Sequence, residues 1–153
     1  IVQQASSQGI TFPILGGDTL DSNVVANAAK GTDVNVTITT FYQEGANPEF
    51  DNGFKAWLNA NNEYLTNNGG NDMIAAVSVM GYDTYYTALE ALKAAGSVDS
   101  KDVKAALPGV TLTGVSGAIA FDEIGDAIRT SAFVKQVDNT SGDWNFVTEQ
   151  TVD

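Results

Sequence analysis

The residues in this chain best suited to chemistry are an acid and the two glycines before it. Gly16, Gly17 and Asp18 follow a short apolar run from Phe12 to Leu15 and precede a helix start. The run is too short for a helix and too continuous for a half-exposed strand, so we expect a strand buried on both faces of a parallel sheet. The glycines permit a sharp turn that leaves Asp18 at the carboxyl end of that strand. Ligands of open α/β sheets bind at such ends, and a carboxylate there can accept hydrogen bonds from an ammonium group.

A structural interpretation of Asp18 is also open. The stretch from Leu20 to Ala29 favours a helix, and its candidate N-caps are Asp21 and Ser22. An acid just before such a helix often does no more than cap it. On this stretch alone, both the ligand-binding and the capping interpretation stand.

Composition limits the classes of function. The chain has 153 residues, of which 43% are hydrophobic and 17% charged, which is typical of a globular chain with one core. Its 19 acids and 7 bases give a net charge of −12, which repels phosphate backbones, so we expect no nucleic acid partner. The chain contains no Cys and no His, which excludes disulfides, thiolate chemistry and the usual general base.

Two sets of oxygen-bearing side chains suggest glycosidase chemistry or calcium binding. Asp122 and Asp126 could be the paired acids of a glycosidase, but we expect them in a solvated hairpin turn without the apolar surroundings that raise a carboxyl pKa. Asp18, Asp21 and Asn23 offer oxygen ligands for calcium, but they lack the glycine and glutamate spacing of an EF-hand. We therefore expect neither an enzyme nor a metal site.

The elements expected to position these residues alternate between strands and helices at short intervals. A helix tail at 1–9 precedes the strand that begins at Phe12. The later elements, in order, are a helix at 20–29, a strand at 33–42, a helix that begins at Asn47-Pro48, an exposed loop at 59–72, a helix at 73–95 or a short strand that leads into one, a helix at 101–107 capped by Ser100, and strands at 118–121, 128–137 and 144–147.

Apolar patterns predict which faces are buried. In the strand at 33–42, Val34, Val36, Ile38 and Tyr42 alternate with polar residues and share one face. The helix at Pro48 is expected to bury the face that carries Phe50, Phe54, Trp57 and Leu58. The long helix is expected to bury the stripe of Val79, Tyr82, Tyr86, Leu89 and Leu92, and Asp83 is interpreted as an N-cap.

Three motifs in order carry a resemblance to a known family. They are Gly-Gly-Asp at 16–18, Gly-Tyr-Asp at 81–83 opening a helix that ends Ala-Leu-Lys-Ala-Ala-Gly at 91–96, and Thr-Gly-Val-Ser-Gly-Ala-Ile-Ala-Phe-Asp-Glu-Ile-Gly-Asp at 113–126. Together they resemble the type I periplasmic binding proteins, and within them the leucine/isoleucine/valine-binding group of ABC-transporter solute receptors. The resemblance covers essentially the whole chain.

The resemblance implies an α/β fold with Rossmann-like parallel sheet layers, in which a ligand lies between two lobes joined by three crossing strands. This chain resembles only the C-terminal part of that fold and ends in a meander of β-hairpins. Residues 1–42 would then belong to the second lobe, 43–112 to the first, and 113–153 to the second again. Hinge crossings are expected near 41–46 and 113–117, and the missing N-terminal half is expected to cover sheet edges left open here.

The resemblance also implies site residues and partners. Asp18 matches the acid that accepts the α-ammonium of an amino acid ligand, and Tyr82 matches an aromatic residue of the side-chain pocket, although it could equally be a core residue. Thr19 is a further candidate contact. The implied protein binds a branched-chain or other aliphatic amino acid outside the cytoplasm, in the periplasm or as a cell-surface lipoprotein, and delivers it to the permease of an ABC transporter without a cofactor. A ligand-sensing domain of a receptor or regulator is the alternative.

Overall fold

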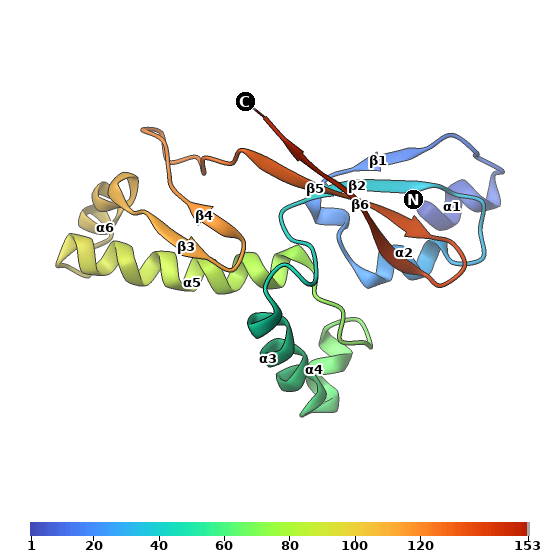
Figure 1. Ribbon diagram of the computed structural model, residues 1–153, viewed down its shortest axis with the longest axis horizontal. Helices are drawn as coiled ribbons and strands as arrows, with labels where there is room; N and C mark the ends of the chain where they lie inside the picture. Colours follow the sequence, from blue (N-terminus) through green and yellow to red (C-terminus); the bar gives the residue numbers. More distant parts are fainter. Residues whose placement is uncertain (153) are drawn as a thin grey trace. The chain divides into compact units, whose positions relative to one another are not determined.

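The computed structural model describes residues 1–152, and its alternating helices and strands are drawn in Figure 1. The helices are α1 (Val2–Ser7), α2 (Asn23–Ala29), α3 (Pro48–Asn59), α4 (Asn62–Asn67), α5 (Ala76–Ala95) and α6 (Ser100–Ala106), with short 3₁₀ helices η1 (Asp18–Leu20) and η2 (Leu107–Gly109). The strands are β1 (Ile14–Gly16), β2 (Val36–Thr40), β3 (Leu112–Gly114), β4 (Gly117–Ile119), β5 (Ser131–Asp138) and β6 (Asp143–Thr151).

These elements form two compact units. The first unit contains Ile1–Val77 and Ser131–Val152, and the second contains Ser78–Thr130. Asp153, the last residue of the expected segment 113–153, lies outside the described residues. The expected assignment of segments to the lobes of a longer protein, with its hinge positions, stays a prediction.

A four-stranded sheet in the order β1-β2-β5-β6 is the framework of the first unit (Figure 1). β1 runs parallel to β2, with Ile14 opposite Val36, and the other neighbours are antiparallel. The alternation predicted for β2 is confirmed, because Val34, Val36 and Ile38 are all buried. The sheet therefore places the loop after β1 beside the end of β2.

Helices α1 and α2 cover one face of this sheet. The core between them consists of small and branched side chains, namely Ala5, Ala26, Ala29, Val34, Val36, Ile38 and Val137. Ser22 caps α2, since its hydroxyl accepts a hydrogen bond of 3.2 Å from the Val24 amide. Burial of such a face contributes roughly 25 cal/mol for each Å² of apolar surface removed from water.

The expectation that the Phe12 strand is buried on both faces is wrong. Phe12 is 67% exposed and Leu15 is 78% exposed. Among the described residues, β1 has only β2 as a neighbour, so it is an edge strand with one face and one edge uncovered. A continuous apolar run alone does not distinguish a central strand from an edge strand with an unpaired edge.

Helix α3 begins as predicted, but the segment after it differs. The Asn47 side chain accepts a hydrogen bond from the Phe50 amide, and Pro48 opens the helix. The predicted loop at 59–72 is wrong in part, because it contains helix α4, capped by Asn61. The polar composition conceals this helix, which is held by the stacking of Tyr64 on Trp57 at 4.3 Å between ring centroids.

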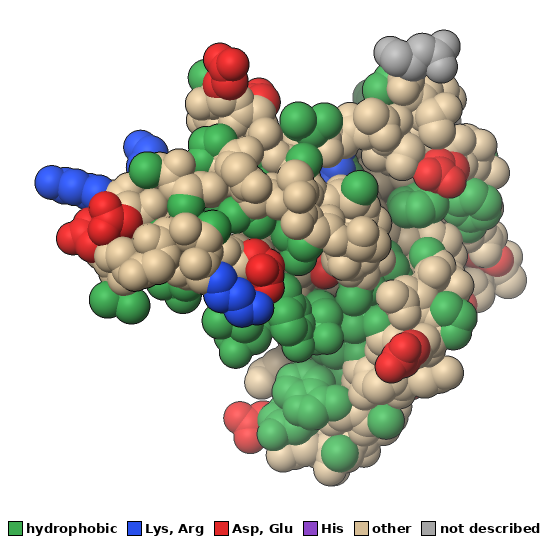
Figure 2. All heavy atoms as spheres, turned by 60° about the vertical axis from the view of Figure 1, so that its left-hand side comes forward, with side chains coloured by type: hydrophobic (Ala, Val, Ile, Leu, Met, Phe, Trp, Pro, Cys, Tyr) green, Lys and Arg blue, Asp and Glu red, His purple; other side chains and the backbone are tan. Residues whose placement is uncertain are grey.

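The buried face predicted for α3 is only partly correct. Leu58 is buried, whereas Trp57 is 52% exposed. Phe50, Phe54 and Trp57 instead stack along the helix, with centroid separations of 5.5 and 5.7 Å. Figure 2 shows that hydrophobic side chains also lie at the surface of the molecule.

The second unit is organised by helix α5, which ends at Ala95 and is followed by Gly96, the residue predicted to stop it. The stripe predicted to face the core is wrong for its tyrosines, because Tyr82 is 45% and Tyr86 42% exposed. Val79 is buried as predicted, but the buried positions after it are Asp83, Thr87 and Ala91, which lie on a neighbouring stripe of the helix. Two polar residues in that stripe hid it from a search for apolar periodicity.

The remaining elements of the second unit are short. Asp99 caps α6, with its carboxylate 2.8 Å from the Lys101 amide, so the prediction of Ser100 as cap is wrong by one residue. β3 and β4 form an antiparallel hairpin. The hairpin turn expected around Asp122 and Asp126 is confirmed by a bridge between Phe121 and Ala127. Within residues 1–152, no helix combines the length and apolar content needed to cross a membrane.

Candidate ligand-binding site

The loop after β1 is shaped by a glycine and a leucine. A side chain at Gly16 would collide with Leu20, whose methyl group lies over the glycine, and would also touch Ile38 at 3.5 Å. The backbone then turns into η1, in which the Leu20 amide bonds to the Gly17 carbonyl at 3.0 Å and the Asp21 amide to the Asp18 carbonyl at 2.9 Å. The apolar side of this turn faces the sheet, and Asp18 and Thr19 are exposed.

The capping interpretation of Asp18 is wrong. Ser22 occupies the N-cap of α2, and the N-cap of η1 is Gly17, which contributes no side-chain bond. Within residues 1–152 the Asp18 carboxylate has no hydrogen-bond or ion-pair partner. An exposed carboxylate on a turn fixed by backbone bonds is available to a ligand cation.

The neighbouring acid, Asp21, has the opposite environment. Its side chain is fully buried and forms an ion pair with Lys135 of β5, with Oδ2 3.1 Å from the amine. The same oxygen accepts hydrogen bonds from the Thr40 hydroxyl at 2.7 Å and from the Ala76 amide at 3.2 Å. Asp21 is therefore neither the N-cap of α2 nor free to bind calcium.

This ion pair was not predicted, although the sequence contains a signal for it. Lys135 alternates with Phe133 and Val137 on one face of β5, so a cation stands at an inward-facing position of a strand. A lysine at such a position requires a buried acidic partner. The sequence indicates that the partner exists but does not identify it as Asp21.

Asn23 fastens the loop after α4 to this region. It is buried, and its amide group donates to the Asn68 carbonyl at 2.7 Å and to Oδ1 of Asn71 at 2.8 Å. Gly69 approaches Asn23 so closely that a side chain at position 69 would collide with it. The three residues considered as calcium ligands therefore have different environments. Asp18 is exposed, Asp21 is paired with Lys135, and Asn23 bonds the loop after α4.

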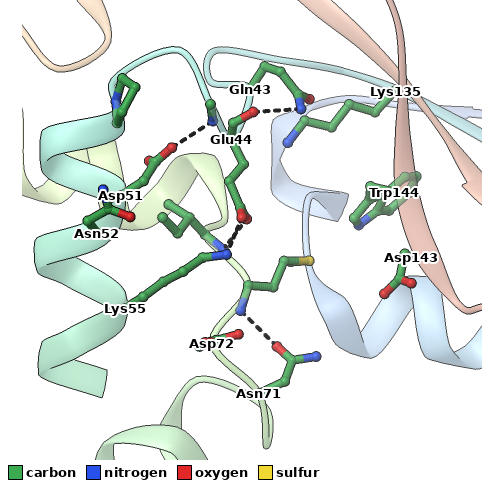
Figure 3. A pocket seen from close by; sticks show the side chains of 14 residues that line it. Gln43, Glu44, Asp51, Asn52, Lys55, Asn71, Asp72, Lys135, Asp143 and Trp144 are labelled. Atoms are coloured by element: carbon green, nitrogen blue, oxygen red, sulfur yellow. Dashed lines mark hydrogen bonds and ion pairs between the residues drawn. The ribbon is translucent and has the colours of Figure 1, made fainter. Parts of the chain in front are cut away.

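A polar hollow of about 710 Å³ opens next to Lys135 in the first unit. Figure 3 shows Lys135 and Trp144 on one side of it and Lys55, with Glu44, on the other. Glu44 and Lys55 form an ion pair, and this hydrogen bond raises the pKa of Lys55. None of the predicted site residues lines the hollow.

The chain entering α3 is fixed by Tyr42. Its hydroxyl donates to Oδ1 of Asp51 at 2.6 Å and accepts from the Asn47 amide at 3.2 Å, while the Gly45 amide donates to Oδ2 of Asp51 at 2.6 Å. Burial, followed by the bond to Asp51, raises the pKa of the Tyr42 phenol well above its usual range. The expected hinge segment at 41–46 therefore forms a turn that is held by the hydrogen bonds of Tyr42 and Asp51.

Tyr82 lies on α5, in the second unit, whereas Asp18 and Thr19 share η1 in the first. Because Tyr82 is 45% exposed, its interpretation as a core aromatic is wrong. It packs against Tyr86 with 4.9 Å between ring centroids, and Tyr85 meets Tyr86 edge to face at 5.3 Å. The three tyrosines form an exposed aromatic cluster that can supply apolar contacts to a partner or ligand.

Asp83 is a helix-interior residue, and its interpretation as an N-cap is wrong. It is buried, and its two oxygens accept hydrogen bonds of 2.8 Å from the amides of Val115 and Ser116 in the β3–β4 turn. A side chain at Gly114 would come within 2.6 Å of the carboxylate. Arg129 also bonds this turn, through the Ser116 carbonyl at 3.1 Å and hydroxyl at 3.0 Å.

Comparison with known families identifies this fold. A family model described as periplasmic binding protein matches residues 1–143. The chain belongs to the periplasmic binding protein family. Its members are solute-binding proteins and not enzymes, so the predicted family is confirmed.

Solved structures of periplasmic binding proteins agree with this assignment. A leucine binding protein LivK from Thermotoga maritima is 29% identical over 98% of this chain, with a TM-score of 0.69. A solute binding protein of an ABC transporter from R. palustris in complex with benzoate is 14% identical over 97% of the chain, with a TM-score of 0.66. An ABC transporter substrate-binding protein from Desulfitobacterium hafniense in complex with Leu is 21% identical over 95%, with a TM-score of 0.61.

These structures confirm the predicted fold class, the type I periplasmic binding protein fold, present in part. The chain spans 40%, 38% and 38% of their respective lengths. Comparison with curated protein sequences gave no match.

Proposed function

We propose that this chain is part of an extracytoplasmic solute-binding component of an ABC transporter, and that its ligand is a branched-chain or other aliphatic amino acid. The observation that carries the proposal is the Asp18 carboxylate, which is exposed on η1 and has no partner within residues 1–152. An α-ammonium group would supply the missing partner through a charge-assisted hydrogen bond. The 29% identity to a leucine binding protein supports the choice of ligand class.

Closure of a cleft around the ligand would strengthen this contact. Exclusion of water lowers the local dielectric, and a hydrogen bond to a charged group contributes about 1.5–3 kcal/mol. Because about 1.4 kcal/mol corresponds to a tenfold change in affinity, loss of the Asp18 charge should weaken binding at least tenfold. In this proposal Thr19 is a second contact from η1, and Tyr82 supplies an apolar wall.

The rest of the cleft is proposed to come from polypeptide outside these residues. The uncovered edge and face of β1 support this, because they border an apolar groove of about 690 Å³ lined by Leu15, Leu20 and Val24 among others. An exposed apolar strand edge is a surface that normally pairs or is covered. The chain also spans only 40% of the leucine binding protein, so a large part of such a protein remains to cover it.

Calorimetric titration of the complete protein against leucine, isoleucine and valine tests the proposal, with a neutral sugar as the negative ligand. Asp18→Asn should reduce affinity for the amino acid at least tenfold while the thermal unfolding midpoint stays unchanged. Asp33→Asn is the matched control, since Asp33 is another exposed acid of the first unit. Unchanged affinity in Asp18→Asn would remove Asp18 from the site, and no heat from any amino acid would refute the proposed ligand class.

A further inference from the structure

Three residues after the proposed ligand contact Asp18, Asp21 forms a buried ion pair with Lys135. The side chains are 0% and 4% exposed, and they join the end of η1 to the inner face of β5. Burying two charges is costly even when they are paired, and an apolar pair of similar size is often as stable. An apolar pair would, however, lack the oxygen of Asp21 that neighbouring donors bond, so the requirement at position 21 is for a fixed acceptor.

The geometry of Asp21 suits such a demand. Its Oδ2 is held by three donors from three different elements: the Thr40 hydroxyl at the end of β2, the Lys135 amine in β5 and the Ala76 amide at the start of α5. Three donors converging on one oxygen fix the side chain in a single orientation. No apolar residue could make these contacts.

The fixed side chain in turn holds the turn that carries Asp18. The Asp21 amide bonds to the Asp18 carbonyl at 2.9 Å, and the Ser22 amide bonds to the Leu20 carbonyl at 2.8 Å. On the opposite side, Leu20 lies over Gly16. The turn is thus anchored at its carboxyl end by Asp21 and pressed onto the sheet by Leu20.

We infer that Asp21, supported by Lys135, is a positioning residue that orients η1 so that the Asp18 carboxylate meets the ligand. The inference rests on the proposed role of Asp18 in amino acid binding. Asp21 itself is buried and touches no ligand, so it acts only through the backbone of the turn.

Two double variants separate positioning from stability. Asp21→Asn with Lys135→Met removes both charges but keeps an oxygen that can accept from Thr40 and Ala76. Asp21→Ala with Lys135→Met removes both charges and that oxygen. The first should bind leucine within about threefold of the wild-type affinity, and the second at least tenfold more weakly, because only the second releases the turn.

Amide hydrogen exchange of the ligand-free protein supplies a readout that does not depend on binding. In Asp21→Ala with Lys135→Met, the amides of Leu20 and Asp21 should exchange at least tenfold faster than in the Asn double variant, relative to amides of the β2 core. Val137→Ala, which creates a cavity two residues from Lys135 on the same strand, is the control for general destabilisation.

The outcomes distinguish the two proposals. If the Ala double variant exchanges at Leu20 and Asp21 in step with the rest of the unit, as Val137→Ala should, or if its affinity equals that of the Asn double variant, Asp21 has no positioning role. If wild-type protein binds no amino acid, the proposed function fails, while the exchange data still decide whether Asp21 anchors the turn.

Discussion

At the scale of single residues, the molecule uses carboxylates in two contrasting ways. Asp18 is exposed and has no partner within residues 1–152, whereas Asp21, Asp51 and Asp83 are buried and each accepts bonds from two or more donors. Buried acids of the second kind are structural anchors, because an unpaired charge in the interior would be too costly. Of these four acids, Asp18 is the one whose carboxylate is accessible to a ligand.

The contact between Asp83 and the β3–β4 turn predicts a strict requirement for glycine at position 114. Gly114→Ala should lower the free energy of unfolding by about 1–3 kcal/mol, because the added methyl group would lie 2.6 Å from the Asp83 carboxylate. Gly109→Ala is the control, since a methyl group there meets nothing within 4 Å. Chemical denaturation measures both, and equal stabilities would contradict the close approach.

Tyr42 predicts a loss of stability at alkaline pH. Its phenol has a raised pKa in the folded state, so the protonated form contributes stability fully below the ordinary tyrosine pKa of about 10. That contribution is lost as the pH rises toward the folded value. Tyr42→Phe should lower stability at neutral pH by about 1–3 kcal/mol, because Asp51 loses a donor, and should flatten the decline above about pH 10.

Tyr85→Phe is the matched control for this prediction, because Tyr85 is 61% exposed. It should leave both the neutral stability and the alkaline decline unchanged. A Tyr42→Phe protein that loses stability above pH 10 as steeply as the wild type would contradict the role assigned to the phenol.

At the scale of elements, the sequence predicted most of what periodicity and caps encode. The alternation of Val34, Val36 and Ile38 defined β2, and Asn47-Pro48 defined the start of α3. Helix α4 was not predicted, because asparagines dominate its segment and its stability comes from packing of Tyr64 on α3. The buried stripe of α5 escaped because Asp83 and Thr87 belong to it, and their partners are distant in sequence.

In the candidate site, too, the features encoded by neighbouring residues could be predicted, and those that depend on distant residues could not. Asp18 and its loop could be proposed from local sequence, because glycines and an acid after an apolar run have a local meaning. The partners of Asp21 could not, since Lys135 lies 114 positions away and Ala76 lies 55. Only the three-dimensional structure shows that Asp21 is buried and paired whereas Asp18 is exposed.

The uncovered strand β1 predicts self-association of the 153-residue chain when it is produced alone. Leu15→Lys should reduce that association, because a charge on an exposed strand edge opposes pairing with another chain. Val98→Lys is the control, since Val98 is 91% exposed but lies between two helices, away from a sheet edge. Sedimentation velocity measures the self-association, and equal association of the two variants would show that the chains do not associate through β1.

At the scale of the whole molecule, the proposed site would take one charged contact, Asp18, from this chain and its other charged contacts from elsewhere. The two units together span about 40% of the leucine binding protein they resemble in fold. We propose that the contacts to the ligand carboxylate come from polypeptide outside this chain. Binding by this chain alone should therefore be weak even if its fold is intact.

The isolated chain should have a much lower affinity for leucine than the complete protein. Loss of two charge-assisted hydrogen bonds at about 1.5–3 kcal/mol each should weaken leucine binding by the isolated chain at least about 100-fold relative to the complete protein. Calorimetry on both proteins measures the ratio, with Leu15→Lys in the isolated chain to keep it monomeric. Equal affinities would mean that residues 1–153 contain a complete site, and the polar hollow beside Lys135 would then replace the Asp18 loop as the place to search for it.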